Sequence, residues 1–451
     1  MRAVVSVVLL ALVTGLARTE EPPKPAEAGE SPAVEHALFP EKESVPLRAS
    51  LSDGVKLFTP DEEFVLRLHV MAQADGKLFL PGNQDPARSG VYLPRVRTYF
   101  EGDLTKSFQY EVSLQRSVEG TFDILDANVN WRPMEQFQVK LGRFLVPYSY
   151  DWYDHLEQFF ITPERGLFPL NFGLSRAGGG MVGWKLAEKR VEYAVGWFSG
   201  QVAGLADTNT TRDAVAYLNV LPFRSTDRFP ALRYLNLGGS VAIGDQQYAA
   251  EPLPLRTSLQ SSDNDEAAQG ASAVFLDFFP GVVALGTRTQ GALHAAWYVN
   301  SLSVETEFAA GRFGYAKEDG TMTVLPVGGF HAGAGYFLTG EQVTDRSVVE
   351  PLRPFNPVSG QRGPGAIEPF ARVSHLRLGS ALFRDGLADA SLYTDRATIV
   401  DIGWNWYPNK YLKFYFDWQH ASYGSPVLIN RKSGTLRQTN DLLWVRAQLN
   451  F

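Results

Sequence analysis

The sequence predicts an all-β fold: a transmembrane antiparallel β-barrel of about 16 strands. Three observations lead to this prediction. Apolar and polar residues alternate with period two in many segments, short turns alternate with long loops, and the mean hydropathy is only −0.15. A barrel hides its hydrophobicity in every second residue, so its average hydropathy resembles that of a soluble chain.

Residues 1–17 are expected to be a signal peptide. Arg2 precedes an apolar run over 3–16, and Gly15 and Ala17 supply the small residues of a cleavage site. The run is too short for a comfortable membrane helix, although a retained membrane anchor is the alternative. The chain is therefore expected to be exported.

Residues 18–60 are expected to form a tail or linker on the periplasmic side. The stretch begins with Glu20-Glu21-Pro22-Pro23-Lys24-Pro25 and has no periodicity, which is typical of extended or disordered chain. A spacer or tether and an inert leader are equally compatible with it.

Residues 61–451 are expected to form the barrel. In 64–74 and 302–310, for example, apolar side chains occupy one parity and polar side chains the other. Glycine and proline stretches and short turns such as 103–106 and 407–410 separate such segments. The predicted strands are 63–75, 91–103, 107–117, 123–132, 136–144, 178–187, 191–200, 212–222, 233–244, 291–300, 302–313, 329–339, 366–378, 395–407, 411–423 and 440–451.

The last predicted strand has a distinctive end. Leu443, Val445, Ala447, Leu449 and Phe451 share one parity, and polar residues dominate the other. An alternating strand that ends in an aromatic residue resembles the assembly signal of bacterial outer-membrane barrels. The resemblance implies that Phe451 is read by the barrel-assembly machinery and that the apolar face contacts outer-membrane lipid. A soluble β-sandwich, the alternative fold, does not explain this end.

Several segments together resemble the phosphate-selective porin O and P family. They are 122–131, 139–148, 164–167, 176–180, 193–200, 281–288 and 334–341. The resemblance implies a barrel in the bacterial outer membrane, usually a homotrimer, whose third loop, here 145–177, folds inward. It also implies a pore lined by arginine and lysine, which attract anions.

Candidate pore-lining residues are charged side chains with the parity of the lumen. An inward positive ring would favour anions such as phosphate, but each cation could instead pair with a nearby carboxylate. The candidates are Arg67, Arg95, Arg97, Asp126, Arg132, Lys140, Arg372 and Lys413.

The predicted constriction loop departs from the phosphate pattern. Its charged residues are Asp151, Asp154, Glu157, Glu164, Arg165 and Arg176, four acids against two bases, and aromatic residues are frequent. An acidic, aromatic constriction favours cations or neutral solutes. The predicted function is a passive channel for small ions, including anions such as phosphate, or other small polar solutes. A non-conducting structural or adhesion barrel is the alternative.

Enzymatic chemistry has little support in the sequence. His420-Ala421-Ser422-Tyr423-Gly424 is similar to the His-x-Ser-x-Gly context of an outer-membrane phospholipase, but no orienting partner for the histidine can be assigned. The seven histidines are scattered and cysteine is absent, so neither a metal site nor a cofactor is expected. The net charge of −7 argues against nucleic acid as a partner.

Overall fold

The computed structural model describes residues 45–51, 54–117, 122–134, 136–154, 156–200, 212–258, 270–357 and 363–451. The expected signal peptide and most of the expected tail lie outside these residues. No helix in the described part is long and apolar enough to cross a membrane.

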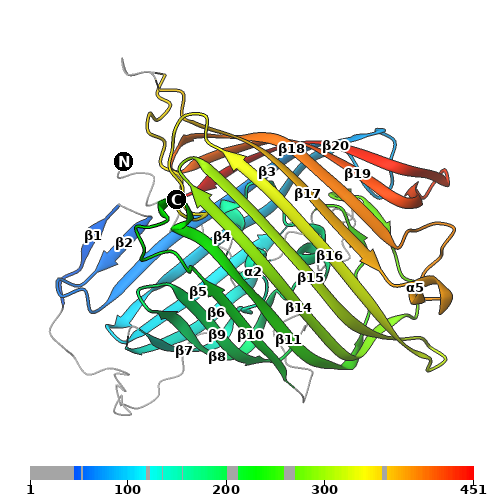
Figure 1. Cartoon of the computed structure of the whole chain (residues 1–451), viewed down its shortest axis with the longest axis horizontal. Helices are drawn as coiled ribbons and strands as arrows, with labels where there is room; N and C mark the ends of the chain where they lie inside the picture. The colour runs from blue at the N-terminus through cyan, green and yellow to red at the C-terminus, as the bar shows by residue number, and fades with distance from the viewer. Residues whose placement is uncertain are drawn as a thin grey trace, which may run out of the picture. The chain divides into compact units, whose positions relative to one another are not determined.

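Sixteen antiparallel strands close into a ring (Figure 1). Each strand pairs with its neighbour along the chain, and the last pairs with the first. The ring consists of β3 (Val65–Leu80), β4 (Gly90–Thr105), β5 (Phe108–Ser117), β6 (Phe122–Met134), β7 (Phe137–Leu145), β8 (Arg176–Leu186), β9 (Val191–Phe198), β10 (Asp213–Val220), β11 (Tyr234–Ala250), β14 (Val283–Val299), β15 (Leu302–Ala316), β16 (Met322–Tyr336), β17 (Ala366–Leu378), β18 (Arg396–Asn409), β19 (Leu412–Asn430) and β20 (Thr435–Asn450).

The ring closes where β20 meets β3. The register runs from Asp441 opposite Leu80 to Asn450 opposite Met71. Phe451 continues the pairing beyond β20, because its backbone exchanges two hydrogen bonds with Val70, at 2.7 and 2.9 Å. The final residue therefore belongs to the closing seam of the barrel.

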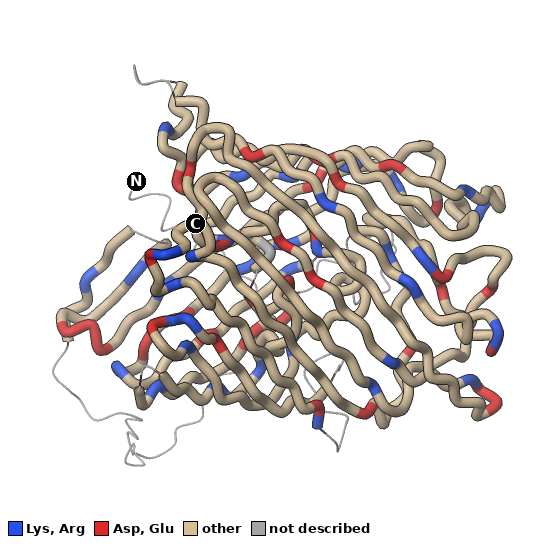
Figure 2. Tube along the Cα trace, viewed as in Figure 1, with Lys and Arg blue, Asp and Glu red and all other residues tan. Residues whose placement is uncertain are grey.

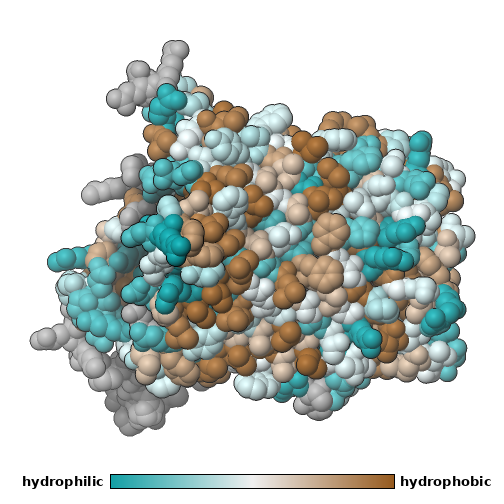
Figure 3. Space-filling view, in the orientation of Figure 1, coloured by the Kyte–Doolittle hydropathy of each residue, from teal (hydrophilic) through white to brown (hydrophobic). Residues whose placement is uncertain are grey.

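The alternation predicted from the sequence divides the wall into two faces. In β20, Leu443, Val445 and Leu449 are exposed on the outside, whereas Trp444 and Arg446 are buried inside. Outward apolar side chains cover the middle of the barrel, and hydrophilic atoms gather toward its ends (Figure 3). This is the arrangement that a lipid bilayer requires of a barrel.

All sixteen predicted strands are present, and the differences concern their ends. Residues 315–328 and 424–438, which lie between predicted strands, are mostly strand, because β15, β16, β19 and β20 extend well past the predicted bounds. Only the connections 317–321 and 431–434 remain outside the strands. The outer ends of these strands carry the same alternation of apolar and polar residues, but glycine and proline residues there hide it in the sequence.

Residues expected in the tail also contribute strands. β1 (Arg48–Ser50) and β2 (Val55–Phe58) form a hairpin, and β2 pairs with β3 from Val65 to Leu68. The hairpin sits on the edge of β3 just beyond the stretch that β20 occupies. Ordered barrel structure thus begins before residue 60.

The long connection 337–365 lies at the end of the barrel that carries the short turns. It joins β16 to β17 at the same end as the two-residue connections after β14 and β18. Short turns mark the periplasmic end in bacterial barrels. The opposite end carries α5 (Ala381–Arg384) and the segments with β12 (Leu255–Arg256) and β13 (Val274–Leu276).

Candidate functional site

The connection between β7 and β8 makes hydrogen bonds with inward side chains of the wall. It contains α2 (Tyr150–Tyr153), η1 (Glu157–Phe159) and α3 (Leu167–Phe172). Ser149 and Tyr150 donate hydrogen bonds to the Glu307 carboxylate of β15, at 2.7 and 2.6 Å, and Leu167 N–H donates to Ser374 Oγ of β17 at 2.7 Å. These contacts with inward side chains fix the position of the loop relative to the wall.

Backbone carbonyls of residues 158–164 accept hydrogen bonds from a row of inward side chains. We call this segment and its six donors the loop clasp. The donors come from β17, β18, β19, β20 and the connection 337–365, and several are cationic, which strengthens the bonds. The pairs are Gln448 to Gln158, Arg346 to Phe159, Lys413 to Phe160, Asn405 to Ile161, Arg446 to Pro163 and Arg372 to Glu164.

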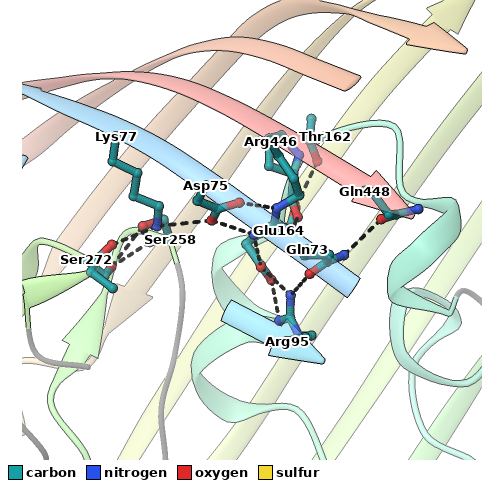
Figure 4. A network of polar contacts seen from close by, with 12 residues as sticks. Gln73, Asp75, Lys77, Arg95, Thr162, Glu164, Ser258, Ser272, Arg446 and Gln448 are labelled. Atoms are coloured by element: carbon teal, nitrogen blue, oxygen red, sulfur yellow. Dashed lines mark hydrogen bonds and ion pairs between the residues drawn. The ribbon is translucent and has the colours of Figure 1, made fainter. Parts of the chain in front are cut away.

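The Glu164 side chain lies at the centre of a buried ion network (Figure 4). Arg95 of β4 binds it with two hydrogen bonds, at 2.6 and 2.9 Å, and Arg446 of β20 binds it at 2.9 Å. Arg446 also makes two bonds to Asp75 of β3, at 2.6 and 2.9 Å. The network therefore ties the loop to both strands of the closing seam.

Electrostatics of this network keep Glu164 ionised. Burial by itself would raise the pKa of the Glu164 carboxyl, but the charges of Arg95 and Arg446 and their hydrogen bonds outweigh burial. They lower the pKa to about 2. A buried carboxylate with two guanidinium partners is compensated, and loss of either partner would leave an unpaired buried charge.

Other predicted pore-lining cations also face inward and also have partners. Arg132 and Arg67 approach Asp103, at 2.8 and 3.8 Å, while Lys140 lies 3.8 Å from Glu111. Arg97 donates to Gln115, Arg372 pairs with Asp401 at 2.8 Å, and Lys413 belongs to the loop clasp. The predicted pore residue Asp126 pairs with the predicted loop residue Arg176 at 2.9 Å. Both signs are interspersed along the strands (Figure 2).

The remaining acids predicted in the constriction loop behave differently from Glu164. Asp154 accepts a hydrogen bond from Tyr217, and burial together with the nearby Glu192 raises its pKa to about 7. Asp151 is buried. The side chain of Glu157 lies outside the described part. The acids of this loop therefore do not form a uniform ring of negative charge.

Arg165 of the same loop contacts aromatic rings. Its guanidinium carbon lies 3.7 Å from the centre of the Trp152 ring and 4.5 Å from that of Phe160. Stacking of this kind stabilises a cation while it satisfies few of its hydrogen-bond donors. The aromatic residues of the loop therefore pack against their own cation and against the wall.

A polar cavity of about 520 Å³ opens in the periplasmic half of the interior. Tyr99, Tyr110, Asn128 and Asn130 contribute to its wall. Its charged lining consists of Arg67, Lys140 and Arg176 against Glu101, Glu111, Asp126 and Glu192, with His69 in addition. Three bases against four acids give this cavity, which we call the vestibule, no excess of positive charge.

The outer half of the interior contains a large apolar cluster. This cluster of buried residues joins inward side chains of the wall with the β7–β8 loop and with the segments that contain β13 and α5. Phe168 and Phe172 of α3, Phe275 of β13 and Leu382 of α5 are members. Residues from three connections therefore pack against inward side chains of the wall on the outer side of the vestibule.

His420 has the orienting partner that sequence reasoning could not assign. Its Nδ1 lies 2.8 Å from Asp441 Oδ1 on the neighbouring strand, and Trp418 donates to the same oxygen at 3.0 Å. Among the described residues, however, no hydrogen bond joins Ser422 to His420. The pair lacks an activated nucleophile.

Sequence reasoning missed three members of the inner networks. Asp75, Arg346 and Arg446 are not among the site residues that the sequence predicts. Arg346, in the connection 337–365, pairs with Glu368 of β17 at 2.6 Å. The parity of Asp75 and Arg446 in their strands could have identified both, whereas Arg346 stands in a loop without periodicity.

Comparison with known proteins gives one family. The model of the phosphate-selective porin O and P family matches residues 67–451. No curated protein matches the sequence. Among solved structures, the outer-membrane channel DcaP of Acinetobacter baumannii matches with 10% identity and a TM-score of 0.51, covering 88% of this chain and 100% of its own. An anion-selective porin from Comamonas acidovorans matches with 13% identity and a TM-score of 0.49, covering 86% of this chain and 99% of its own.

Proposed function

The chain belongs to the phosphate-selective porin O and P family, and we propose that within this family it is a weakly selective channel for small polar solutes rather than a phosphate-specific one. Family membership makes it an outer-membrane porin and not an enzyme. The proposal concerns which solutes pass through the channel and which residues determine its selectivity.

The observation that carries the proposal is the pairing of the inward cations. Arg95 and Arg446 share Glu164, Arg372 is held by Asp401, and the loop clasp occupies Lys413. A phosphate ion must compete with these partners, because anion selectivity needs uncompensated positive charge facing the solute. The vestibule, with four acids and three bases, offers no such excess.

We propose that the β7–β8 loop forms the constriction. Its contacts with β11, β15 and β17 and the loop clasp support a fixed position across the lumen. The predicted site residues Asp151, Asp154, Glu164, Arg165 and Arg176 then act through the loop: Glu164 and Arg176 anchor it, and Asp154 supplies a charge that depends on pH.

Reversal potential across a planar bilayer tests the solute preference. Purified protein in a KCl gradient is expected to give a near-neutral or weakly cation-selective current, and added phosphate is expected to leave that current unblocked. An anion-selective current that phosphate blocks would refute the proposal and assign the selectivity to the wall arginines.

Three further proposals concern assembly. We propose that residues 1–17 are removed on export, that the barrel-assembly machinery reads Phe451, and that three chains associate in the membrane. Family membership supports the trimer, and the alternating terminal strand supports the assembly signal. N-terminal sequencing of the mature protein and native mass spectrometry of the detergent-extracted protein test the first and the third.

A further inference from the structure

A groove on the outer surface of the wall lies away from the lumen and from the residues of the proposed channel. It has a volume of about 960 Å³ and extends over β11, β14, β15, β16 and β17. These strands face the viewer in Figure 1. Four strand spacings separate β11 from β17, about 19 Å. One leaflet of a bilayer has a hydrocarbon thickness of about 15 Å, so the groove is long enough for one lipid tail.

The floor of the groove consists of small outward residues that lie abreast. Gly291 of β14 stands opposite Ala310 of β15, and Ala310 stands opposite Gly328 of β16. A Cβ atom on Gly328 would meet nothing closer than 3.9 Å, and one on Gly291 nothing closer than 3.4 Å. Neither glycine is required by backbone conformation or crowding, so their effect is to leave the surface hollow.

Large apolar side chains border the floor on the periplasmic side. Leu293, Phe308 and Phe330 occupy the next outward row. Leu293 stands opposite Phe308, and Phe308 stands opposite Phe330. All three are exposed. An acyl chain in the hollow would pack against the edges of these side chains, and van der Waals contact would favour it there, because no hydrophobic driving force acts within the bilayer.

Arginines border the floor at two places: Arg312 lies two residues beyond Ala310 on β15, and Arg377 stands opposite Gly328 at the β17 end of the floor. Arg312 and Arg377 line the groove, and Arg396 stands directly opposite Arg377 in the register. All three are exposed. Like charges directly opposite each other destabilise a sheet, and within the described part of the chain no ion pair relieves these three. Asp395 also lines the groove, and no ion pair joins it to them there.

Arg312 stands at the height of the lipid head groups. On β16, ten residues separate Tyr336, at the periplasmic end, from Pro326, which lies opposite Arg312. A tilted strand crosses the hydrocarbon of a bilayer with about 9–11 residues. The hollow therefore faces the tails of the outer leaflet, and Arg312 faces its phosphates, with Arg377 lining the same groove.

We propose that this groove binds a phosphate-bearing lipid of the outer leaflet, with one acyl chain on the floor of Gly291, Ala310 and Gly328 and the phosphate between Arg312, Arg377 and Arg396. Arginine suits this role because its planar guanidinium binds phosphate through two parallel hydrogen bonds. The charge and the apolar hollow together favour a lipid over a free anion, which would use only the arginines.

Native mass spectrometry of the detergent-purified, full-length protein tests the proposal. Dioleoyl-phosphatidylglycerol is titrated in one arm, dioleoylglycerol, which has the same tails without phosphate, in the second, and inorganic phosphate in the third. The wild type is expected to retain phosphatidylglycerol, and to retain neither of the other two. Equal retention of both lipids would overturn the proposal, as would retention of inorganic phosphate alone.

Two variants separate the two halves of the site. Removing the head-group contacts with R312Q/R377Q/R396Q and filling the hollow with Gly328→Leu are each expected to weaken phosphatidylglycerol binding by about tenfold or more. Gly328→Leu keeps every charge, so it remains informative if the triple variant folds poorly. Arg384→Gln, in α5 and off the groove, is the matched control and is expected to bind as the wild type does.

The same spectra report the oligomeric state. If both variants bind phosphatidylglycerol as the wild type does but lose an oligomer, a second copy of the chain covers the groove and the proposal is overturned. An unchanged oligomer with weakened lipid binding supports it.

Discussion

Glu164 shows how one residue can hold a loop across a lumen. Its carboxylate joins Arg95 and Arg446, and its backbone carbonyl accepts from Arg372. Charge, geometry and burial act together, because each guanidinium is itself anchored on a different strand of the wall. Removal of the carboxylate would leave two buried cations with fewer partners.

Glu164→Gln is expected to destabilise the barrel by about 3 kcal/mol, since one partner of a buried ion network is lost. Because two cations are left undercompensated, the current should also shift toward anions. Urea unfolding followed by tryptophan fluorescence and the reversal potential measure the two effects. Glu63→Gln, an exposed acid at the periplasmic end, is the control; equal effects in both variants would contradict the role of Glu164.

Acid should act through the same residue. The pKa of Glu164, about 2 in the folded protein, lies below its ordinary value of 4.5. Its stabilising contribution is therefore complete above pH 4.5 and is lost as the pH falls toward 2. Urea midpoints between pH 5 and pH 2 should fall in the wild type and fall less in Glu164→Gln.

Ionisation of Asp154 should lower folding stability, and it should occur at a higher pH than that of Glu164. Burial and Glu192 raise its pKa to about 7, so the folded protein holds it neutral below that pH, and folding stability declines as the pH rises from 3.8 to about 7. Ionisation adds a negative charge to the loop. Cation preference should increase about twofold between pH 6 and pH 8, about 0.4 kcal/mol. A pH dependence unchanged in Asp154→Asn would exclude this residue as its source.

At the scale of elements, the loop clasp turns wall cations into mechanical supports. Lys413, Asn405 and Arg446 bind backbone carbonyls whatever the loop side chains are. Neutralising such a donor should release the loop more than it changes selectivity. The lumen would then widen where the loop withdraws.

Arg446→Gln is accordingly expected to raise single-channel conductance and to make the current noisier. Arg67→Gln removes the same charge from an inward position that pairs with Asp103 and lies outside the loop clasp, so its conductance should stay close to that of the wild type. Single-channel recordings in KCl measure both. If the two variants change conductance equally, net charge and not the loop clasp decides the current.

The seam between β20 and β3 makes Phe451 a structural residue as well as a proposed signal. Deleting it removes two backbone hydrogen bonds to Val70 and the contact of its ring with Tyr411, whose centre lies 5.5 Å away. We expect a lower yield of inserted protein in the outer membrane, measured by membrane fractionation. Phe451→Tyr keeps the ring and the backbone and should insert normally; normal insertion of the deletion variant would count against both roles.

At the scale of the whole molecule, the strands of the wall were predictable from the sequence, whereas the contacts inside the barrel were not. Period-two alternation fixes which residues face lipid, so all sixteen strands and the inward parity of Arg95 and Arg372 follow from local pattern. Partners of those side chains depend on which strands meet across the lumen. Glu164 and Arg446 are separated by 282 residues, a pairing that no local pattern contains.

Prediction from the sequence also failed for loops whose side chains pack in the interior of the barrel. Phe172, Phe275 and Leu382 of the apolar cluster come from three connections without periodicity, so each of these segments by itself resembles an ordinary external loop. The extra hairpin of β1 and β2 was missed because its strands have only three and four residues. Both features exist only because the closed wall offers them a surface to pack on.

The closing seam also sets the order of events in the life of the chain. Gln73 of β3 hydrogen-bonds Gln448 of β20 across 375 positions of sequence, and the ion network of Asp75 and Arg446 spans nearly the same distance. None of these bonds can form until the final strand has been delivered. Until then β3 keeps an open edge, and Asp75 and Glu164 lack Arg446, so pairing of the last strand both closes the barrel and completes the network that holds the β7–β8 loop.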